Sequence, residues 1–163
     1  MRKVVVNSTP LIVLCNAGRL GLLQDLYGEI SIPEAVYREV TRKRDSACRV
    51  LLEAPEWIKV CEVEPPSDVR LLSTRLHAGE VEVMELARST SADLVVMDDQ
   101  AAKKTAEFLG LTVTGTLGVL VRAKEQGYLE AVAPVLARMK VQGFYVGELV
   151  ERMALEAAGE LNE

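Results

Sequence analysis

Two adjacent carboxylates, Asp98 and Asp99, end the short apolar run 94–97 and are the strongest indication of chemistry in this sequence. An apolar run without polar alternation is typical of a strand buried on both faces of a parallel sheet. In open parallel sheets the ligand crevice lies just beyond the carboxyl ends of the strands, so two acids there could bind a cation or transfer protons. The same pair could also simply cap a helix over 100–109. The pair alone does not decide between the two roles.

The beginning of the chain repeats this pattern. Residues 3–6 form an apolar run that leads into Asn7, Ser8, Thr9 and Pro10. Proline is favoured at the first helical position with Ser or Thr before it, so we predict a helix over 10–16 that is capped by Ser8 or Thr9. Asn7 would lie beside the paired acids if the two strands are neighbours, although it also suits a turn or a cap.

Glu80 is a second candidate for the site. On a helix it shares a face with Val83, Met84 and Ala87, which is the face that we expect to be buried. A carboxylate in a core costs several kcal/mol unless it is paired, protonated or bound to metal. Its other reading, an interaction with the helix dipole, is worth only about 0.3 to 1 kcal/mol, so we favour a site role. We expect Glu82 and Glu85 on the same helix to be in solvent, and His77, the only histidine, to cap the helix or lie on the surface.

Other charged residues border the same predicted edge. Glu39 lies beside the apolar stripe of Val36 and Val40 on a helix over 33–42, where a structural and a site role are equally suitable. Lys103 and Lys104 fall in the first turns of the helix over 100–109, where cations do not suit the helix dipole. We therefore expect the two lysines to face an anion.

The remaining pattern supplies the elements that would position these groups. Residues 111–114 read as a third parallel strand, and Gly115 with Thr116 opens the helix that follows it. Residues 57–63, which include charged side chains, read as an edge strand. Further helices are predicted over 131–140 and 147–158. The last of these is predicted to turn four residues inward: Leu149, Val150, Met153 and Ala157.

Length and composition limit the classes of protein. A chain of 163 residues predicts one α/β domain over 1–163, with helices over about 128–160 packed onto it. No apolar run could cross a bilayer and no leader pattern is present, so we expect a cytoplasmic protein. Three cysteines without C-x-x-C spacing, Cys15, Cys48 and Cys61, indicate reduced thiols with no assigned role. A net charge of −5 argues against a broad basic surface for nucleic acid, but not against a local basic rim.

Five segments together resemble PIN-domain proteins in their order along the chain. They are residues 4–12, residues 32–40, Gly79 with Glu80 and its helix, residues 96–99, and residues 114–118. The similarity is greatest to a small prokaryotic branch of predicted nucleic-acid-binding PIN proteins, DUF3368, which is related to the toxin ribonucleases of toxin–antitoxin pairs. It spans nearly the whole chain. The resemblance implies a three-layer, Rossmann-like α/β/α sandwich around a parallel sheet, and a Mg²⁺- or Mn²⁺-dependent endoribonuclease.

Position by position, the resemblance implies that the catalytic acids are Glu39, Glu80, Asp98 and Asp99. These would hold the metal, with Asn7 as a weak or indirect ligand. Other polar groups would contact the RNA substrate: Ser8, Thr9, Lys103, Lys104 and Thr116. An antitoxin protein and a second copy of the chain are the further partners that it implies.

Physical chemistry supports this ligand set. Two carboxylates about 4 Å apart repel by about 4 kcal/mol at an effective dielectric constant of about 20, so converging acids need a cation. Oxygen ligands without His or Cys favour Mg²⁺ or Mn²⁺ over zinc. PIN nucleases usually carry Asp where this chain has Asn7, so weaker metal binding is expected. The alternative is therefore a catalytically weak or degenerate domain that binds RNA or a protein. A receiver-like phosphoacceptor fits less well, because it needs acids and a lysine after other strands, where Asn7 and Thr114 lie.

Overall fold

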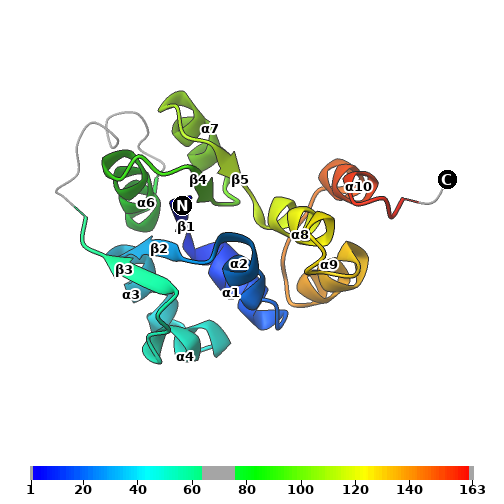
Figure 1. The fold of residues 1–163 in the computed structure, drawn as a ribbon, viewed down its shortest axis with the longest axis horizontal. Helices are drawn as coiled ribbons and strands as arrows, with labels where there is room; N and C mark the ends of the chain where they lie inside the picture. Colours follow the sequence, from blue (N-terminus) through cyan, green and yellow to red (C-terminus); the bar gives the residue numbers. More distant parts are fainter. Residues whose placement is uncertain (1, 64–75, 162–163) are drawn as a thin grey trace.

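The computed structural model, which describes residues 2–63 and 76–161, has an all-parallel sheet of five strands at its centre (Figure 1). The strand order is β3-β2-β1-β4-β5, and each neighbouring pair is parallel. The strands are β1 (Val4–Val6), β2 (Ile30–Pro33), β3 (Ile58–Cys61), β4 (Leu94–Val96) and β5 (Val113–Thr114). The α/β class and the three-layer architecture predicted from the sequence are confirmed.

The two strands that carry the site, β1 and β4, lie side by side at the centre of the sheet. Val6 pairs with Val96, and every residue of both strands is buried. The N–H of Asn7 donates to the carbonyl of Val96 at 2.9 Å, so Asn7 continues the ladder to the point where β4 ends. The two strands are therefore neighbours, which is the condition under which the sequence placed Asn7 beside the paired acids.

Helices cover both faces of this sheet. α3 and α6 pack against one face, and α2 with α8 packs against the other. The helices described are α1 (Ser8–Asn16), α2 (Gly21–Tyr27), α3 (Glu34–Arg42), α4 (Ser46–Leu52), α6 (Ala78–Ser89), α7 (Gln100–Phe108), α8 (Thr116–Glu125), α9 (Val132–Val141) and α10 (Glu148–Ala157). None of the helices in the described ranges is long and apolar enough to cross a membrane.

The first helix starts earlier than the sequence predicts. α1 begins at Ser8, and the residue before it is Asn7, whose backbone is extended (φ −83°, ψ 173°). The predicted cap by Ser8 or Thr9 is wrong, because Ser8 is already helical and its hydroxyl donates to the carboxylate of Glu39. Pro10 is accommodated in the first turn, where a missing N–H breaks no helical hydrogen bond.

Glu85 also departs from expectation. Only 9% of its surface is exposed, and it pairs with Arg88 at 3.7 Å, so the prediction that it is in solvent is wrong. Glu82 is half-buried and accepts the N–H of Ala35 at 3.1 Å, which ties α6 to the start of α3. Glu82 lies where α3 packs against α6, and that packing is not visible in the pattern of α6 alone.

The predicted inward face of α10 is wrong. Leu149 is 70% exposed, Val150 50% and Met153 59%, and Ala157 is exposed as well. α10 lies against α8 at the end of the molecule far from β3 (Figure 1), and its contacts with the core come from Leu155 and Ala158 instead. The amphipathic pattern is real, but its main apolar face points away from the domain.

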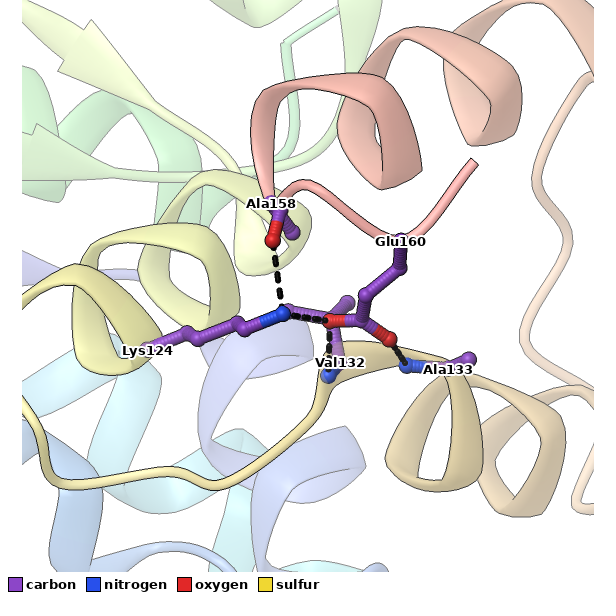
Figure 2. Close-up of polar contacts among 5 residues, drawn as sticks. All are labelled: Lys124, Val132, Ala133, Ala158 and Glu160. Carbon is purple, nitrogen blue, oxygen red and sulfur yellow. Dashed lines mark hydrogen bonds and ion pairs between the residues drawn. The ribbon is translucent and has the colours of Figure 1, made fainter. Parts of the chain in front are cut away.

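A polar clasp fixes the end of α10 (Figure 2). The carboxylate of Glu160 accepts the N–H groups of Val132 and Ala133 at 2.7 and 2.9 Å, at the start of α9. Lys124 of α8 donates to Glu160 at 3.0 Å and to the carbonyl of Ala158 at 2.6 Å. Three helices are joined in this way, and Glu160 caps α9, whose own N-cap residue makes no side-chain bond.

Candidate active site

A pocket of about 270 Å³ lies at the carboxyl ends of β1 and β4 and collects most of the predicted acids. Glu39 reaches it from α3, Glu80 from α6, and Asp99 from the end of β4. We call it the acidic pocket, and its lining is Asn7, Ser8, Thr9, Glu39, His77, Glu80 and Asp99. Residues from four separate segments of the chain therefore meet at one edge of the sheet.

Each acid of the pocket is oriented by one hydrogen bond. Ser8 Oγ donates to Glu39 Oε2 at 2.5 Å, and the N–H of His77 donates to Glu80 Oε1 at 3.0 Å. Asp99 Oδ1 accepts the N–H of Ala102 at 2.8 Å, so the capping role considered for the pair belongs to Asp99. In each case one carboxylate oxygen is used and the other makes no hydrogen bond to a described residue.

The charges of the pocket act on one another. Burial raises the pKa of Glu80, and the nearby carboxylates of Asp99 and Glu39 raise it further. The N–H of His77 acts in the opposite direction without cancelling these effects. Because only 6% of Glu80 is exposed, water screens this repulsion poorly. The pocket therefore favours either a proton on Glu80 or a bound cation.

Asp98 faces a different environment from Asp99. Its two oxygens accept the N–H of Thr116 at 2.8 Å and the hydroxyl of Thr116 at 2.6 Å. Thr116 is fully buried at the start of α8, so both of its donors serve Asp98. The first acid of the pair thus ties β4 to α8, and it lines a neighbouring hollow rather than the acidic pocket.

The two lysines of α7 are placed differently from each other. Lys103 lines the same neighbouring hollow as Asp98, whereas Lys104 is exposed and lines neither it nor the acidic pocket. A Cβ on Gly115 would stand 2.8 Å from Asp98 Oδ1 and 2.9 Å from Lys103 Nζ. Glycine at this position is what lets the ammonium and the carboxylate lie over the start of α8.

The donor set of the acidic pocket suits a hard cation. Carboxylate and carboxamide oxygens are the ligands that Mg²⁺ and Mn²⁺ prefer. Gly79 leaves room for an ion, since a Cβ there would stand 3.2 Å from Glu39 Oε2 and 3.9 Å from Asn7 Oδ1. Within residues 2–63 and 76–161, no three acidic, histidine or cysteine side chains are already close enough to chelate a metal. The ligand types therefore fit a divalent ion, while their spacing is wider than that of a closed metal site.

The sequence matches the family model DUF3368, described as a PIN domain, over residues 3–160. The chain belongs to the PIN-domain family. The fold is therefore of the nuclease type, PIN domains generally use divalent metals, and interaction with nucleic acid is the general expectation for a PIN domain. No curated protein matches the chain significantly.

The sequence indicated the acidic residues of this PIN domain better than the neighbouring residues that orient them or line the adjoining hollow. The contact of Ser8 with Glu39 was missed, because the two are brought together by the packing of α1 against α3. The hollow beside Lys103 was missed as well, since its other wall comes from the connection between α9 and α10. The adjacent aromatics Phe144 and Tyr145 in that connection were a signal available in the sequence.

Proposed function

We propose that this PIN domain is a divalent-metal-dependent endoribonuclease that hydrolyses phosphodiester bonds in RNA. The observation that carries the proposal is the meeting of Asn7, Glu39, Glu80 and Asp99 in one pocket at the carboxyl ends of the strands. This is the edge where parallel sheets bind their ligands, and the family is a nuclease-type one.

The residues have distinct roles in this proposal. Glu80 and Asp99 hold the metal, Glu39 binds it directly or through water, and Asn7 contributes a neutral carbonyl oxygen. Asp98 acts as a positioning residue, because it fixes the end of β4 against α8 through Thr116. When bound, Mg²⁺ or Mn²⁺ supplies the Lewis acidity that activates water and stabilises the leaving oxygen.

The pocket residues also prepare the site for that chemistry. The hydroxyl of Ser8 keeps Glu39 turned toward the pocket, and the cap formed with Ala102 fixes Asp99. These hydrogen bonds hold each acid in a fixed orientation and leave its second oxygen for the metal. Thr9 is exposed at the rim where RNA would pass, Ser8 lies buried behind it, and Lys103 and Lys104 supply positive charge on α7.

A second function has support of its own: a degenerate PIN domain that binds RNA or a protein without cleaving it. Two observations favour it. Asn7 replaces the carboxylate usual in PIN nucleases, and the described acids do not yet form a chelating group of three. Both features lower metal affinity, and a domain without bound metal retains its binding surfaces.

Cleavage assays separate the two functions. The protein is incubated with single-stranded and structured RNA in Mn²⁺, Mg²⁺ or EDTA. Asp99→Asn is the sharper variant, because asparagine still caps α7 through its amide oxygen while the charge is lost. Mn²⁺-dependent cleavage that this variant loses supports the nuclease. Cleavage in EDTA, or a fully active variant, contradicts the mechanism, and binding without cleavage selects the degenerate domain.

We extend the proposal to a toxin role, in which a protein antitoxin blocks the cleavage. The extension follows from the relation of the DUF3368 branch to toxin ribonucleases. Co-purification with the product of the adjacent gene and loss of cleavage in the complex would support it. Unchanged cleavage in the presence of that product would contradict it. Sedimentation of the isolated chain tests the homodimer that the resemblance also implies.

A further inference from the structure

A second hollow of about 330 Å³ adjoins the acidic pocket on the far side of Asp98. It is lined by α7, by the start of α8, and by the connection between α9 and α10. We call it the lysine hollow, and the residues that matter here are Asp98, Lys103, Leu117, Phe144, Tyr145 and Val146. Asp98 lines this hollow and Asp99 lines the acidic pocket, so consecutive residues at the end of β4 divide the two.

We propose that the lysine hollow binds one nucleotide of single-stranded RNA, with its base against the ring of Tyr145 and its phosphate at Lys103. This inference rests on the proposed function, because it places that nucleotide next to the phosphodiester bond in the acidic pocket. It assigns a binding site and the class of its ligand.

Lys103 has the properties of a phosphate contact. Its ammonium forms no ion pair within 4.0 Å with a carboxylate of the described residues, although it stands over Gly115 on the same side as Oδ1 of Asp98, whose two oxygens already accept from Thr116. It lies in the first turn of α7, where a cation gains nothing from the helix dipole. Lys103 therefore provides a positive charge close to the acidic pocket, whose carboxylates would otherwise repel the RNA backbone.

Tyr145 has the properties of a base platform. Its surface is 88% exposed, although a tyrosine ring usually buries most of its apolar area. Phe144 and Tyr145 line the lysine hollow and also a third hollow, of about 340 Å³, that extends to Thr9 at the rim of the acidic pocket. Phe144 and Tyr145 are therefore shared by two hollows, one of which reaches Asp98 and the other Thr9. This placement is expected for aromatic residues that stack on the bases of single-stranded RNA.

The composition of the lysine hollow favours a nucleotide over a protein segment. Leu117 and Val146 provide an apolar wall for a base, while the ammonium of Lys103 and the carboxamide of Gln100 are polar. The net charge of −5 argues against binding that depends on many phosphate contacts. Stacking on an aromatic ring is the contribution that remains, and it tolerates any base because every base has a π-face.

The experiment measures binding apart from cleavage. Oligouridine is titrated into the full chain in EDTA, which suppresses the proposed metal-dependent reaction. Tyr145→Ala should weaken binding by about tenfold, and Tyr145→Phe should retain it. Lys103→Ala should weaken binding and flatten the dependence of log K on log salt by about 0.7. These exposed or partly exposed positions allow substitution without loss of fold, which circular dichroism verifies.

Matched controls isolate the hollow. Val141→Ala changes an equally exposed apolar residue on α9, and Arg49→Ala removes a charge on the distant α4. Both should bind oligouridine as the wild type does. In a Trp57→Phe background, Tyr145→Trp provides a single fluorophore whose emission RNA should quench.

Binding and fluorescence together decide whether the lysine hollow is a nucleotide site. Weakened binding by Tyr145→Ala and Lys103→Ala, with quenching of the introduced tryptophan, supports the nucleotide site even if no cleavage is ever seen. Three results overturn it. The first is that both variants bind RNA as tightly as the wild type, and the second is that RNA does not quench the introduced tryptophan. The third is that the Tyr145→Ala variant differs from the wild type in oligomeric state but not in RNA affinity. The last would identify the hollow as a protein interface. If the wild-type protein binds RNA in this hollow but never cleaves it, only the proposed nuclease function is contradicted.

Discussion

Asp98 and Thr116 form a closed pair in which both carboxylate oxygens accept from a single residue, at 2.8 Å from the N–H and at 2.6 Å from the hydroxyl. The contact spans 18 positions of sequence and joins the end of β4 to the start of α8. It explains why adjacent acids have different roles. Asp98 organises the edge of the sheet, and Asp99 lies in the acidic pocket.

Thr116→Val is therefore expected to destabilise the fold. Valine has nearly the same shape but its side chain cannot donate to Asp98 Oδ2, and a hydrogen bond to a charged group contributes about 1.5 to 3 kcal/mol, of which the half-exposed Asp98 should show the lower end. The free energy of unfolding in urea measures this loss. Thr116→Ser keeps the hydroxyl and should be close to the wild type. If valine and serine have the same stability, the hydroxyl of Thr116 does not hold Asp98.

Glu80→Gln separates charge from packing at the acidic pocket. The glutamine amide oxygen can still accept the N–H of His77, so the start of α6 is preserved. Removing the charge relieves the repulsion from Asp99 and Glu39 that raises the pKa of Glu80. The variant should be more stable than the wild type without metal and should lose stabilisation by Mn²⁺. Thermal denaturation with Mn²⁺ or EDTA tests both, and equal Mn²⁺ stabilisation of the two proteins would contradict the metal role.

Asn7→Asp should have the opposite effect. A fourth carboxylate in the pocket adds attraction for a divalent ion and should strengthen Mn²⁺ binding by about tenfold. The same charge adds repulsion when no metal is present, so the apo variant should melt at a lower temperature. Isothermal titration calorimetry gives the affinity. An unchanged affinity would show that position 7 lies outside the metal site.

Glu160→Gln tests the clasp of the C-terminal helices. Burial by itself raises the pKa of Glu160, but the N–H groups of Val132 and Ala133 and the ammonium of Lys124 outweigh it and hold the pKa below the ordinary 4.5. The charged form thus stabilises the fold above pH 4.5, and the contribution disappears as the pH falls through the lowered pKa. The variant should be about 1 kcal/mol less stable at neutral pH.

The pH dependence of that difference supplies its own control. Melting temperatures of the wild type and of Glu160→Gln should converge as the pH falls below the ordinary glutamate range, because the wild-type carboxylate is then protonated. A difference that persists unchanged at low pH would mean that hydrogen bonding, and not charge, accounts for the clasp. No difference at neutral pH would mean that Glu160 does not hold α10.

The sequence predicted the centre of this fold well because the local patterns there agree with the tertiary structure. Unbroken apolar runs such as 94–97 can only be buried, and the polar residues that follow them come to the edge of a parallel sheet. Glu80 was identifiable since its helical face is otherwise apolar. These inferences need only the periodicity of one element at a time.

The predictions fail where the environment of a residue depends on how two secondary-structure elements pack against each other. α10 is amphipathic, but no periodicity shows whether its apolar face meets its own domain, and Leu149 is in fact 70% exposed. Gly118 is a second example. The structure shows that a Cβ there would stand 2.1 Å from Thr114 Oγ1, so the glycine permits the close approach of α8 to β5. Spacing along the chain does not encode such approaches.

A crystal soaked in Mn²⁺ gives the most direct test that the acidic pocket is a metal centre. The anomalous difference map should show a manganese peak among Asn7, Glu39, Glu80 and Asp99, and the peak should vanish in Asp99→Asn. A map at saturating Mn²⁺ with no peak in this pocket, or with its only peak elsewhere, would contradict the metal-dependent nuclease.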